Sequence, residues 1–510
     1  MQTGLHIIRE QLFGKGYYDT TTPEYIPKGY LAVAKNVVIS NEKIDKRKGY
    51  TILGQDMGDK KILGIQGITT TAGTKRLYAF LNNSGDTAIE IWENVGTGNW
   101  TMIDNTLLTN VGHDVNCAVA EGVVYAFDGA STPVKITPGT PSTVTAVADG
   151  NFPKGSFAVW FHNFLFVGGV TTTPNRLYWS DLEDSDDFTN GITGFLDVNP
   201  DDGDKITALA VLGDELILFK RNRIWSLTGF GENTFTANDL NERMTGFGTP
   251  AARSVVNVGN DLYYVSHTGG VPQFRSLQRT RFSTVVSGGI ISEDIQGTMA
   301  GFNEAQLAKI AGVYDGKRLL YAFPTSGNSE NVQVLVYDTE LEGWVLWTGL
   351  YAAVFAEFDF GNESEIYFGE SRADSKIYKL DNSTSDNGVA IDMDVQTRRY
   401  GADRPEIKKK WKYLYMTVEE AGDYSLDIDY SRDGFTWADL GEVDLSPVGT
   451  IFPFEFPAYL GDTDIKKDRL YFAKLTSYFL QLRFRQSGLD EECSIRGWEL
   501  LYKQRSLRDA

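Results

Sequence analysis

The stretch that decides the fold is residues 117–127, CAVAEGVVYAF. It consists of a short apolar run, a two-residue turn at Glu121 and Gly122, and a second apolar run that carries Tyr125 and Phe127. Two short runs of β-branched, aromatic and small apolar residues that flank a tight turn predict a β-hairpin. The same arrangement recurs along the chain, and this hairpin is therefore the unit on which the fold is built.

Seven copies of this unit lie between residues 62 and 369, and each leads from an apolar strand through a Gly, Asp or Asn turn to an aromatic-rich strand. The paired runs are residues 62–65 and 76–80, 117–119 and 123–127, 157–161 and 164–167, 206–211 and 216–219, 255–258 and 262–265, 310–313 and 319–323, and 354–356 and 365–369. Several copies are followed by an outer strand, as at residues 176–179, 223–226 and 376–379.

The aromatic strands recur at intervals of about 40 to 57 residues. This period is typical of four-stranded β-propeller blades, which stack radially because a single blade cannot bury its own faces. We therefore predict an all-β fold in which residues 56–380 form a multi-bladed β-propeller of about seven blades. A pair of large β-sandwiches is the alternative, because sandwiches also alternate strands with turns.

The two ends of the chain depart from the repeat. Beyond the polar, turn-rich residues 381–388 the alternating strands become longer, which predicts an antiparallel, jelly-roll-like β-sandwich over residues 381–510. Its expected strands are residues 391–397, 413–418, 424–430, 479–484 and 497–502. Residues 1–55 are expected to form an extended arm with a short strand at residues 37–39. Helix is expected only within residues 292–309, with Ser292 and Asn303 as candidate N-caps.

Charge and composition exclude several classes of function. The chain has 510 residues, with 48 basic and 68 acidic side chains and a net charge of −20. Proteins that grip duplex DNA need a basic footprint, whereas an acidic wall lets DNA pass without adhering. Two cysteines, Cys117 and Cys493, are too few for a disulfide scaffold, and no clustered zinc ligands accompany them. No signal peptide and no apolar run of 18 residues is visible, so we expect a soluble protein of a reducing compartment without membrane insertion.

Three polar stretches are candidates for chemistry. Residues 197–204 (DVNPDDGD) hold the densest carboxylate cluster, for which we weigh a calcium loop against a polar turn between blades, and we favour the turn because no Glu closes the loop. The acidic residues 180–187 (SDLEDSDD) are expected to form a solvated loop. Residues 430–437 (YSRDGFTW) resemble the Asp-box hairpin of sialidases and related propellers, apart from a shortened spacing to Trp437, and this motif stabilises a turn.

No catalytic, cofactor-binding or metal-binding residue is assigned. The histidines, His6, His113, His162 and His267, are scattered, and no nucleophile elbow or P-loop is recognisable. We expect no cofactor and no enzymatic activity. A glycoside hydrolase remains an alternative, because its carboxylates come from distant positions and leave no fixed spacing.

Two basic runs reverse the local charge, at residues 43–48 and 408–412. They are candidate docking patches for an acidic neighbouring subunit. The alternative is a solvated strand edge whose lysines prevent aggregation.

Three stretches resemble a family of tailed-bacteriophage virion proteins. The first comprises residues 23–30 (PEYIPKGY), 34–37 (AKNV) and 43–50 (KIDKRKGY) of the arm. The second joins residues 176–181 (RLYWSD) to residues 197–204, and the third is the closing segment from GWELLYK at residues 497–503 to Arg508.

The resemblance implies a β-propeller component of a phage tail that forms a nozzle, hub or stabilisation ring below the portal and adaptor. Copies are expected to form a ring, with six the expected number, around the DNA exit channel, and to contact adaptor or portal-proximal proteins and tail fibres. DNA would pass without sequence-specific binding, the protein would assemble in the bacterial cytoplasm, and its final place would be the virion tail. The arm would complete a sheet edge of a neighbour. The alternative is a glycan-binding adhesin, in which side chains such as Trp344 and Trp347 stack on sugar rings unless they belong to the core.

Overall fold

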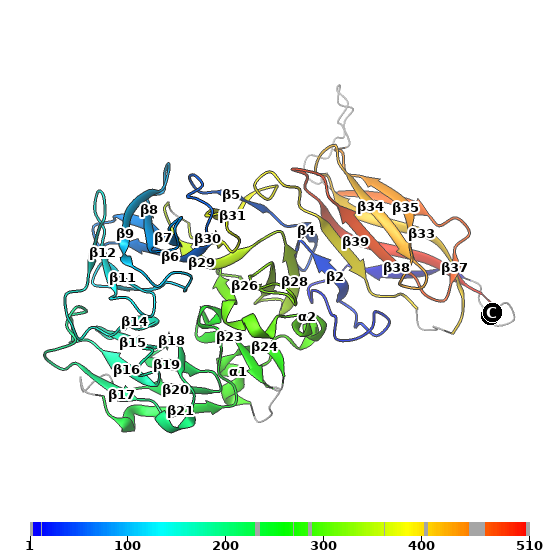
Figure 1. Cartoon of the computed structure of the whole chain (residues 1–510). Helices are drawn as coiled ribbons and strands as arrows, with labels where there is room; N and C mark the ends of the chain where they lie inside the picture. The colour runs from blue at the N-terminus through cyan, green and yellow to red at the C-terminus, as the bar shows by residue number, and fades with distance from the viewer. Residues whose placement is uncertain are drawn as a thin grey trace.

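The computed structural model describes residues 4–11, 13–229, 235–268, 270–283, 288–361, 363–401, 406–447 and 465–505. Figure 1 shows a ring of small sheets on one side, built from residues coloured blue through yellow, and a twisted sandwich of longer strands on the other. The predicted all-β fold with a propeller and a C-terminal sandwich is confirmed.

Four consecutive blades have four antiparallel strands each. In chain order their strands are β6 (Ile62–Thr69), β7 (Lys75–Asn82), β8 (Ile89–Asn94) and β9 (Thr101–Leu108); β10 (Asn116–Ala120), β11 (Val123–Phe127), β12 (Val134–Thr137) and β13 (Thr143–Ala146); β14 (Phe157–Phe161), β15 (Phe164–Gly168), β16 (Arg176–Trp179) and β17 (Gly194–Asp197); and β18 (Ile206–Leu212), β19 (Glu215–Lys220), β20 (Arg223–Leu227) and β21 (Leu240–Thr245).

The remaining part of the ring is less regular. Three strands form one blade, another blade takes its fourth strand from the N-terminal region, and four strands between them belong to a larger sheet. These are β22 (Val256–Val258), β23 (Asp261–Thr268) and β24 (Val271–Ser276); β29 (Ala352–Phe358), β30 (Glu365–Glu370), β31 (Ile377–Ser383) and β5 (Gly49–Ile52); and β25 (Ala311–Tyr314), β26 (Arg318–Phe323), β27 (Gln333–Asp338) and β28 (Gly343–Thr348).

Among the described residues, six sheets are thus separate blades, where about seven were predicted. The difference arises because β25–β28, which lie between β24 and β29 in the chain, run on into a nine-stranded sheet that extends to the sandwich. The sequence repeat counts hairpins, and it does not reveal when the outer edge of one blade pairs with strands of another domain.

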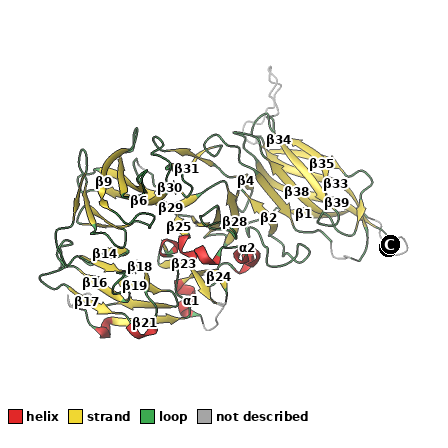
Figure 2. Cartoon of the chain, viewed as in Figure 1, coloured by secondary structure: helices red, strands yellow, loops and turns green. Residues whose placement is uncertain are grey.

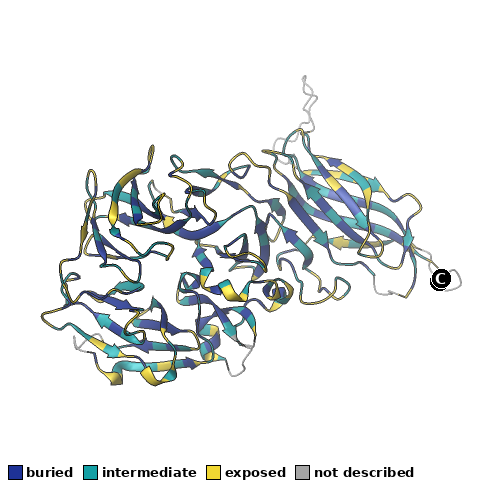
Figure 3. Ribbon diagram, viewed as in Figure 1, coloured by how far each residue is buried: buried dark blue, intermediate teal, exposed yellow. Residues whose placement is uncertain are grey.

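The recurrent aromatic strands are the second strands of the blades. In β7, β11, β15, β19, β26 and β30 most consecutive residues are buried on both sides, because each strand lies between two neighbouring blades (Figure 3). The hairpin turn predicted at Glu121 and Gly122 has positive φ at both residues, 49° and 79°. This pair of angles matches the turn that suits the twist of two-residue hairpins.

Five short strands of the N-terminal region pair with strands from three different sheets. β1 (His6–Glu10) pairs with β39 (Ser494–Gln504), and β2 (Leu31–Lys35) lies between β28 and β32 (Met393–Thr397). β3 (Val37–Ile39) pairs with β4 (Ile44–Lys46), which pairs with β39, and β5 completes the last blade beside β31. The arm, expected to reach a neighbouring subunit, therefore completes sheets of its own chain.

The sandwich consists of two sheets. One has the order β3-β4-β39-β33-β36, with β1 beside β39 and β37 beside β33; the other is the outer part of the nine-stranded sheet, in the order β2-β32-β38-β34-β35. The new strands are β33 (Lys409–Glu419), β34 (Ser425–Ser431), β35 (Trp437–Asp444), β36 (Ile465–Tyr471), β37 (Thr476–Ser477) and β38 (Gln481–Gln486). Alternate residues such as Leu414, Met416, Ile428 and Phe484 are buried between the sheets, as the period of two requires.

Helices are short and lie on the ring side of the molecule (Figure 2). They are α1 (Leu277–Phe282) and α2 (Gln296–Ala300), with 3-10 turns at Pro200–Asp202, Ala237–Asp239, Ala252–Ser254, Glu293–Ile295 and Glu304–Lys309. The Asn303 side chain caps its turn as predicted, accepting from the Ala305 amide at 3.2 Å, whereas the Ser292 hydroxyl accepts from the Phe274 amide instead. Within the described ranges, no helix combines the length and the apolar character that a membrane span requires.

Candidate functional site

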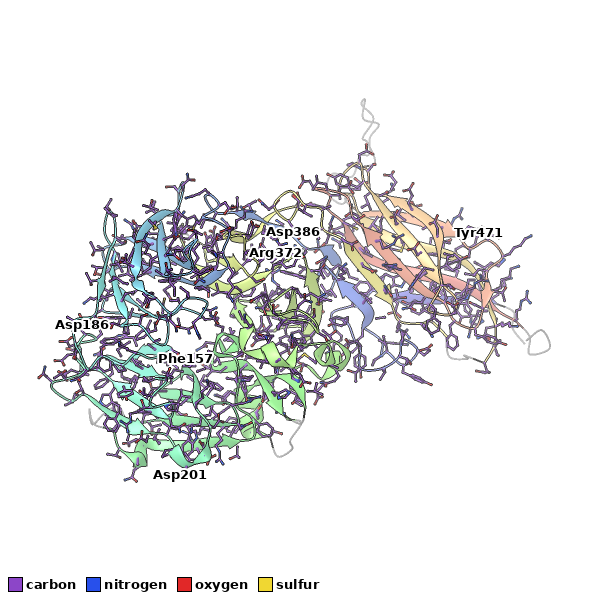
Figure 4. All side chains as sticks on the ribbon, viewed as in Figure 1. Phe157, Asp186, Asp201, Arg372, Asp386 and Tyr471 are labelled. Atoms are coloured by element: carbon purple, nitrogen blue, oxygen red, sulfur yellow. The ribbon has the colours of Figure 1, made fainter. Side chains whose placement is uncertain are left out.

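The propeller axis is a narrow cavity of about 260 Å³. Inner strands from all parts of the ring line it with small, apolar or uncharged side chains, and Figure 4 labels one of them, Phe157. The lining also includes Gln66, Asn116, Cys117 and Arg253, of which only Arg253 carries a formal charge at neutral pH. This volume is below the range of ordinary small-ligand pockets.

Arg253 lies where the axial cavity meets a wider cavity of about 590 Å³ on one face of the ring. Its Nη2 donates to the carbonyl oxygens of Leu63 and Val115, the latter at 3.1 Å, and its Nη1 is 3.2 Å from Asp114 Oδ1. The guanidinium therefore joins strand ends of two blades across the end of the axis. No local sequence pattern marks this residue, because its acceptors come from more than a hundred residues away.

The wider cavity is lined by connecting loops of several blades and includes His113, Asp114 and Asp128. Burial acts to raise the pKa of Asp128, but hydrogen bonds from Ser131 and from the amides of Ala130 and Asn110 outweigh it and hold the pKa below its usual range. These hydrogen bonds make Asp128 a carboxylate that stabilises its turn.

A third cavity, of about 610 Å³, lies at the junction of the arm, the propeller and the sandwich. Lys46 lines it and donates to Gln486 Oε1 at 2.5 Å and to the Gly488 carbonyl at 3.1 Å. Burial lowers the pKa of the Lys46 ammonium. Burial also raises the pKa of the neighbouring Cys493 thiol to about 12, and it raises that of Cys117 as well, so neither thiol is a nucleophile at neutral pH.

The carboxylate loop at residues 197–204 encloses an ammonium group. Lys220 Nζ lies 2.8 and 2.9 Å from the two Asp202 oxygens, 3.2 Å from Asn175 Oδ1, and 3.1 and 3.3 Å from the carbonyls of Asn199 and Asp204. Both Lys220 and Asp202 have almost no exposed side chain, at 0% and 5%. The preferred interpretation as a turn between blades agrees with this arrangement, since Lys220 occupies the position that a cation would take.

The prediction that the acidic loop at residues 180–187 is solvated is only partly right, because Glu183 and Asp184 are exposed while Ser180 and Ser185 are buried. Ser185 is buried, and Asp186 Oδ1 accepts from the Tyr125 hydroxyl at 2.6 Å while Asp186 Oδ2 binds Lys135. Ser185 also donates to Glu121. These contacts connect the loop, which follows β16, to the preceding blade formed by β10–β13.

The Asp-box-like hairpin has the structural role predicted for it. Asp433 Oδ1 accepts from the amides of Phe435 and Thr436, both at 2.9 Å, and Oδ2 accepts from the Thr436 hydroxyl at 2.6 Å. These bonds, with that from the Thr436 hydroxyl the strongest, hold the pKa of Asp433 well below its usual range. They define the turn between β34 and β35.

The four histidines are not brought together. His6 stacks on Tyr502 with ring centroids 5.2 Å apart, His162 Nε2 is 3.9 Å from Asp214, and His267 Nε2 is 3.5 Å from Glu304, while His113 lies in a loop at the wider cavity. Across the described ranges of the chain, no group of three His, Cys, Asp or Glu side chains is arranged to hold a metal ion.

Neither basic run lies on an edge strand, and part of each is buried. Lys46 and Arg47 are buried in the first run, and Lys409 is buried in the second. β33, which carries Lys409, lies between β39 and β36 and is not an edge strand. Trp344 and Trp347 are likewise buried, as the core interpretation predicted, and their indole nitrogens donate to the carbonyls of Ile291 and Val37 at 2.8 Å.

The stretches that resemble the phage family lie apart in the chain but partly together in space. β4, within the first stretch, pairs with β39, which contains residues 497–503 of the third, so these parts of the two stretches share one sheet. In the third stretch the residues from 506 to Arg508 lie outside the described residues. The second stretch is in a separate blade, where Arg176 binds Asp197 through two hydrogen bonds of 2.7 and 2.9 Å.

Comparisons with known proteins give no family. No model of a known protein family and no curated protein matches the sequence. Similar solved structures include the Pan2 WD40 domain of Neurospora crassa (TM-score 0.39, 8% identity, 68% of this chain and 98% of that one) and YCF48 bound to D1 peptide (0.39, 9%, 70% and 99%). An exo-beta-1,3-galactanase from Phanerochaete chrysosporium is also similar (0.27, 10%, 89% and 100%).

Proposed function

We propose that this chain is a structural component of a bacteriophage tail, and that several copies form a ring, a nozzle or hub, around the channel through which DNA leaves. The observation that carries the proposal is the position of the charge. Residues 56–380 contain 22 basic and 39 acidic side chains, whereas the rest of the chain contains 26 and 29. The acidic charge thus belongs to the propeller, which would repel a passing phosphate backbone rather than bind it.

The propeller's own axis is not the conduit in this proposal. Its cavity of about 260 Å³ ends at the Arg253 guanidinium, which is held by the carbonyls of two blades. A nucleic acid strand needs far more room than this cavity offers. DNA would therefore move along acidic outer surfaces of neighbouring copies arranged around a common axis.

Stiffness supports a mechanical role. Domains in one chain usually move relative to each other unless they share a large hydrophobic interface. Here one nine-stranded sheet runs from β25 in the ring to β35 in the sandwich, and one apolar core extends from Phe274 and Tyr321 to Leu414 and Phe484. Propeller and sandwich thus move as one wedge-like body, which suits a subunit of a pressure-bearing ring. The likeness of the arm and of β39 to phage virion proteins supports the same assignment, with adaptor or portal-proximal proteins and tail fibres as neighbours.

Electron microscopy of negatively stained, purified protein tests the proposal. We expect class averages of rings with an open centre, sixfold in symmetry. Particles that stay single in every condition, together with binding on a glycan array, would instead support a glycan-binding adhesin of the tail. Turnover of a polysaccharide by the pure protein would support a propeller glycoside hydrolase.

A further inference from the structure

One outer face of the sandwich is apolar at its centre. Across neighbouring strands β1, β39, β33 and β36, the outward residues Ile7, Leu501, Tyr413 and Tyr471 form one row. Ile7 and Tyr471 are 51% and 54% exposed, and the rings of Tyr413 and Tyr471 have centroids 5.5 Å apart. Exposed apolar groups that are contiguous, unlike single ones, mark interaction surfaces.

Cations surround this row. Arg469 lies 5.3 Å from the ring centroid of Tyr413, and Lys467 lies 5.6 Å from that of Tyr415, which follows in the next outward row. Arg9 is in the same row as Tyr415, where Glu499 lies 3.1 Å from Arg9 and 3.6 Å from Lys467. We call the set Ile7, Tyr413, Tyr415, Lys467, Arg469 and Tyr471 the aromatic–basic face.

The opposite outer face of the sandwich is of another kind. There Arg483 binds Asp394 through bonds of 2.9 and 2.6 Å, and Arg485 binds Asp429 at 2.8 Å across adjacent strands. Asp394 and Asp429 are themselves buried, at 8% and 7% exposed, so these charges neutralise one another within the face. The aromatic–basic face combines apolar rings with an excess of one sign of charge, and this combination is enriched where proteins bind.

A matching surface occurs on the propeller of the same chain. Three neighbouring hairpin turns and the loop at residues 180–187 meet there, because Glu121 accepts from Ser185, Glu183 donates its amide to the Asn163 carbonyl, and His162 approaches Asp214. We call Glu121, Glu183, Asp184, Asp187 and Asp214 the acidic edge; Asp186 lies among them and is paired with Lys135. Asp214 has a 99% exposed side chain, and Glu183 and Asp184 are exposed as well.

We infer that the aromatic–basic face of one copy docks on the acidic edge of the next, an inference that rests on the proposed ring-forming function. Figure 4 places Tyr471 and Asp186 at opposite ends of the molecule. Two different, complementary patches at opposite ends give a head-to-tail contact, which closes into a ring when the rotation permits. A nucleic acid is the less suitable occupant, since the strongly acidic propeller of the same chain repels it.

A charge-swap experiment tests the contact with the full-length chain. One variant, K467E/R469E, reverses the face, and a second, E183K/D214K, reverses the edge. Sedimentation velocity at low ionic strength is expected to show association of the wild type that weakens with added salt, and a loss of association of at least about tenfold for each variant alone. A 1:1 mixture of the two variants is expected to associate again, because each altered face then meets an altered edge of opposite charge.

The matched control is K35D/D392K, which exchanges the partly exposed ion pair of Lys35 and Asp392 at β2 and leaves association unchanged. Three results would overturn the contact: a wild type that is monomeric at low ionic strength, variants that associate like the wild type, or a mixture that does not recover. A monomer that retards single-stranded DNA through Lys467 and Arg469 would replace it with a nucleic-acid surface.

The outcomes separate the contact from the proposed function. Rings that survive both variants would reject these surfaces and keep the ring. Salt-sensitive filaments that recover in the mixture would keep the surfaces and reject the ring.

Discussion

Arg47 and Asp386 form a buried, two-bonded ion pair, with Arg47 Nη1 2.7 Å from Asp386 Oδ1 and Nη2 2.5 Å from Oδ2. The side chains are 0% and 6% exposed. Arg47 also donates to Asn36 Oδ1 at 3.0 Å and to the Thr348 carbonyl at 2.8 Å. This one guanidinium therefore joins the arm, a propeller strand and the segment that leads into the sandwich.

Replacing Arg47 with Met leaves the Asp386 carboxylate buried without its partner, so we expect the free energy of unfolding to fall by about 3–5 kcal/mol. Urea unfolding followed by tryptophan fluorescence measures the change. The control is Lys35→Met, whose pair with Asp392 is partly exposed and whose loss we expect to cost less than about 1 kcal/mol. Equal losses in the free energy of unfolding would show that the buried pair contributes no more than the partly exposed one.

Calcium is expected to leave the thermal stability of the wild type unchanged, because the Lys220 ammonium already satisfies the oxygens of Asp202, Asn199 and Asp204. Lys220→Met removes that charge, and we expect a loss of about 3–5 kcal/mol in calcium-free buffer. Scanning calorimetry with calcium and with a chelator measures both effects, with the exposed Lys205→Met as the control. An upward shift of the wild-type midpoint on adding calcium would contradict the assignment.

Lys409 is expected to make stability rise with pH. Burial lowers the pKa of its ammonium from 10.5 to about 8, and the charge of Glu406 opposes this only in part. Between these two values the unfolded chain binds more protons than the folded one, so the free energy of unfolding increases with pH in this window and the penalty is complete below it. Urea midpoints from pH 7 to pH 10 are expected to rise less in Lys409→Met, and identical slopes would refute this. The exposed Lys467→Met is the control.

Asp433 is expected to hold one turn rather than the whole sandwich. In Asp433→Ala the amides of Phe435 and Thr436 lose their acceptor, and we expect their hydrogen exchange to accelerate by at least about tenfold, since such caps are each worth about 1 kcal/mol or more. Acid is expected to have the same effect in the wild type only well below pH 4, because the pKa of Asp433 is depressed. Exchange mass spectrometry resolves this hairpin, with Asp427→Ala as the control; unchanged exchange at residues 435 and 436 would argue against the role.

Local patterns predicted the elements well and their partners poorly. The hairpin turn at Glu121 and Gly122, the strands of the sandwich and the buried Trp344 and Trp347 follow from alternation, turn chemistry and aromatic burial, all of which act over a few residues. The nine-stranded sheet that joins the propeller to the sandwich was not predicted. It depends on the pairing of β28 with β2 through Leu346 and Lys35, which are more than 300 positions apart.

The charged residues show the same limit. Lys409 stands in a run of lysines that is typical of an exposed edge, and only the pairing of β33 with β39 and β36 places it inside. Lys220 lies 18 residues after Asp202, in the next blade. The sequence of the loop at residues 197–204 therefore does not reveal that a lysine ammonium pairs with its carboxylate. The aromatic–basic face combines β1 with strands from the other end of the chain, which no single stretch reveals.

The closure of the last blade has a consequence for biosynthesis. Asn382 donates to the Thr51 hydroxyl at 2.8 Å across 331 residues, where β31 lies beside β5. At ordinary translation rates the ribosome needs roughly 20–60 s to make the intervening chain. Until then β5 lacks its partner strand, and an unpaired strand edge is a surface prone to aggregation. β5, the strand that completes the last blade, is thus among the first segments to leave the ribosome and among the last to pair.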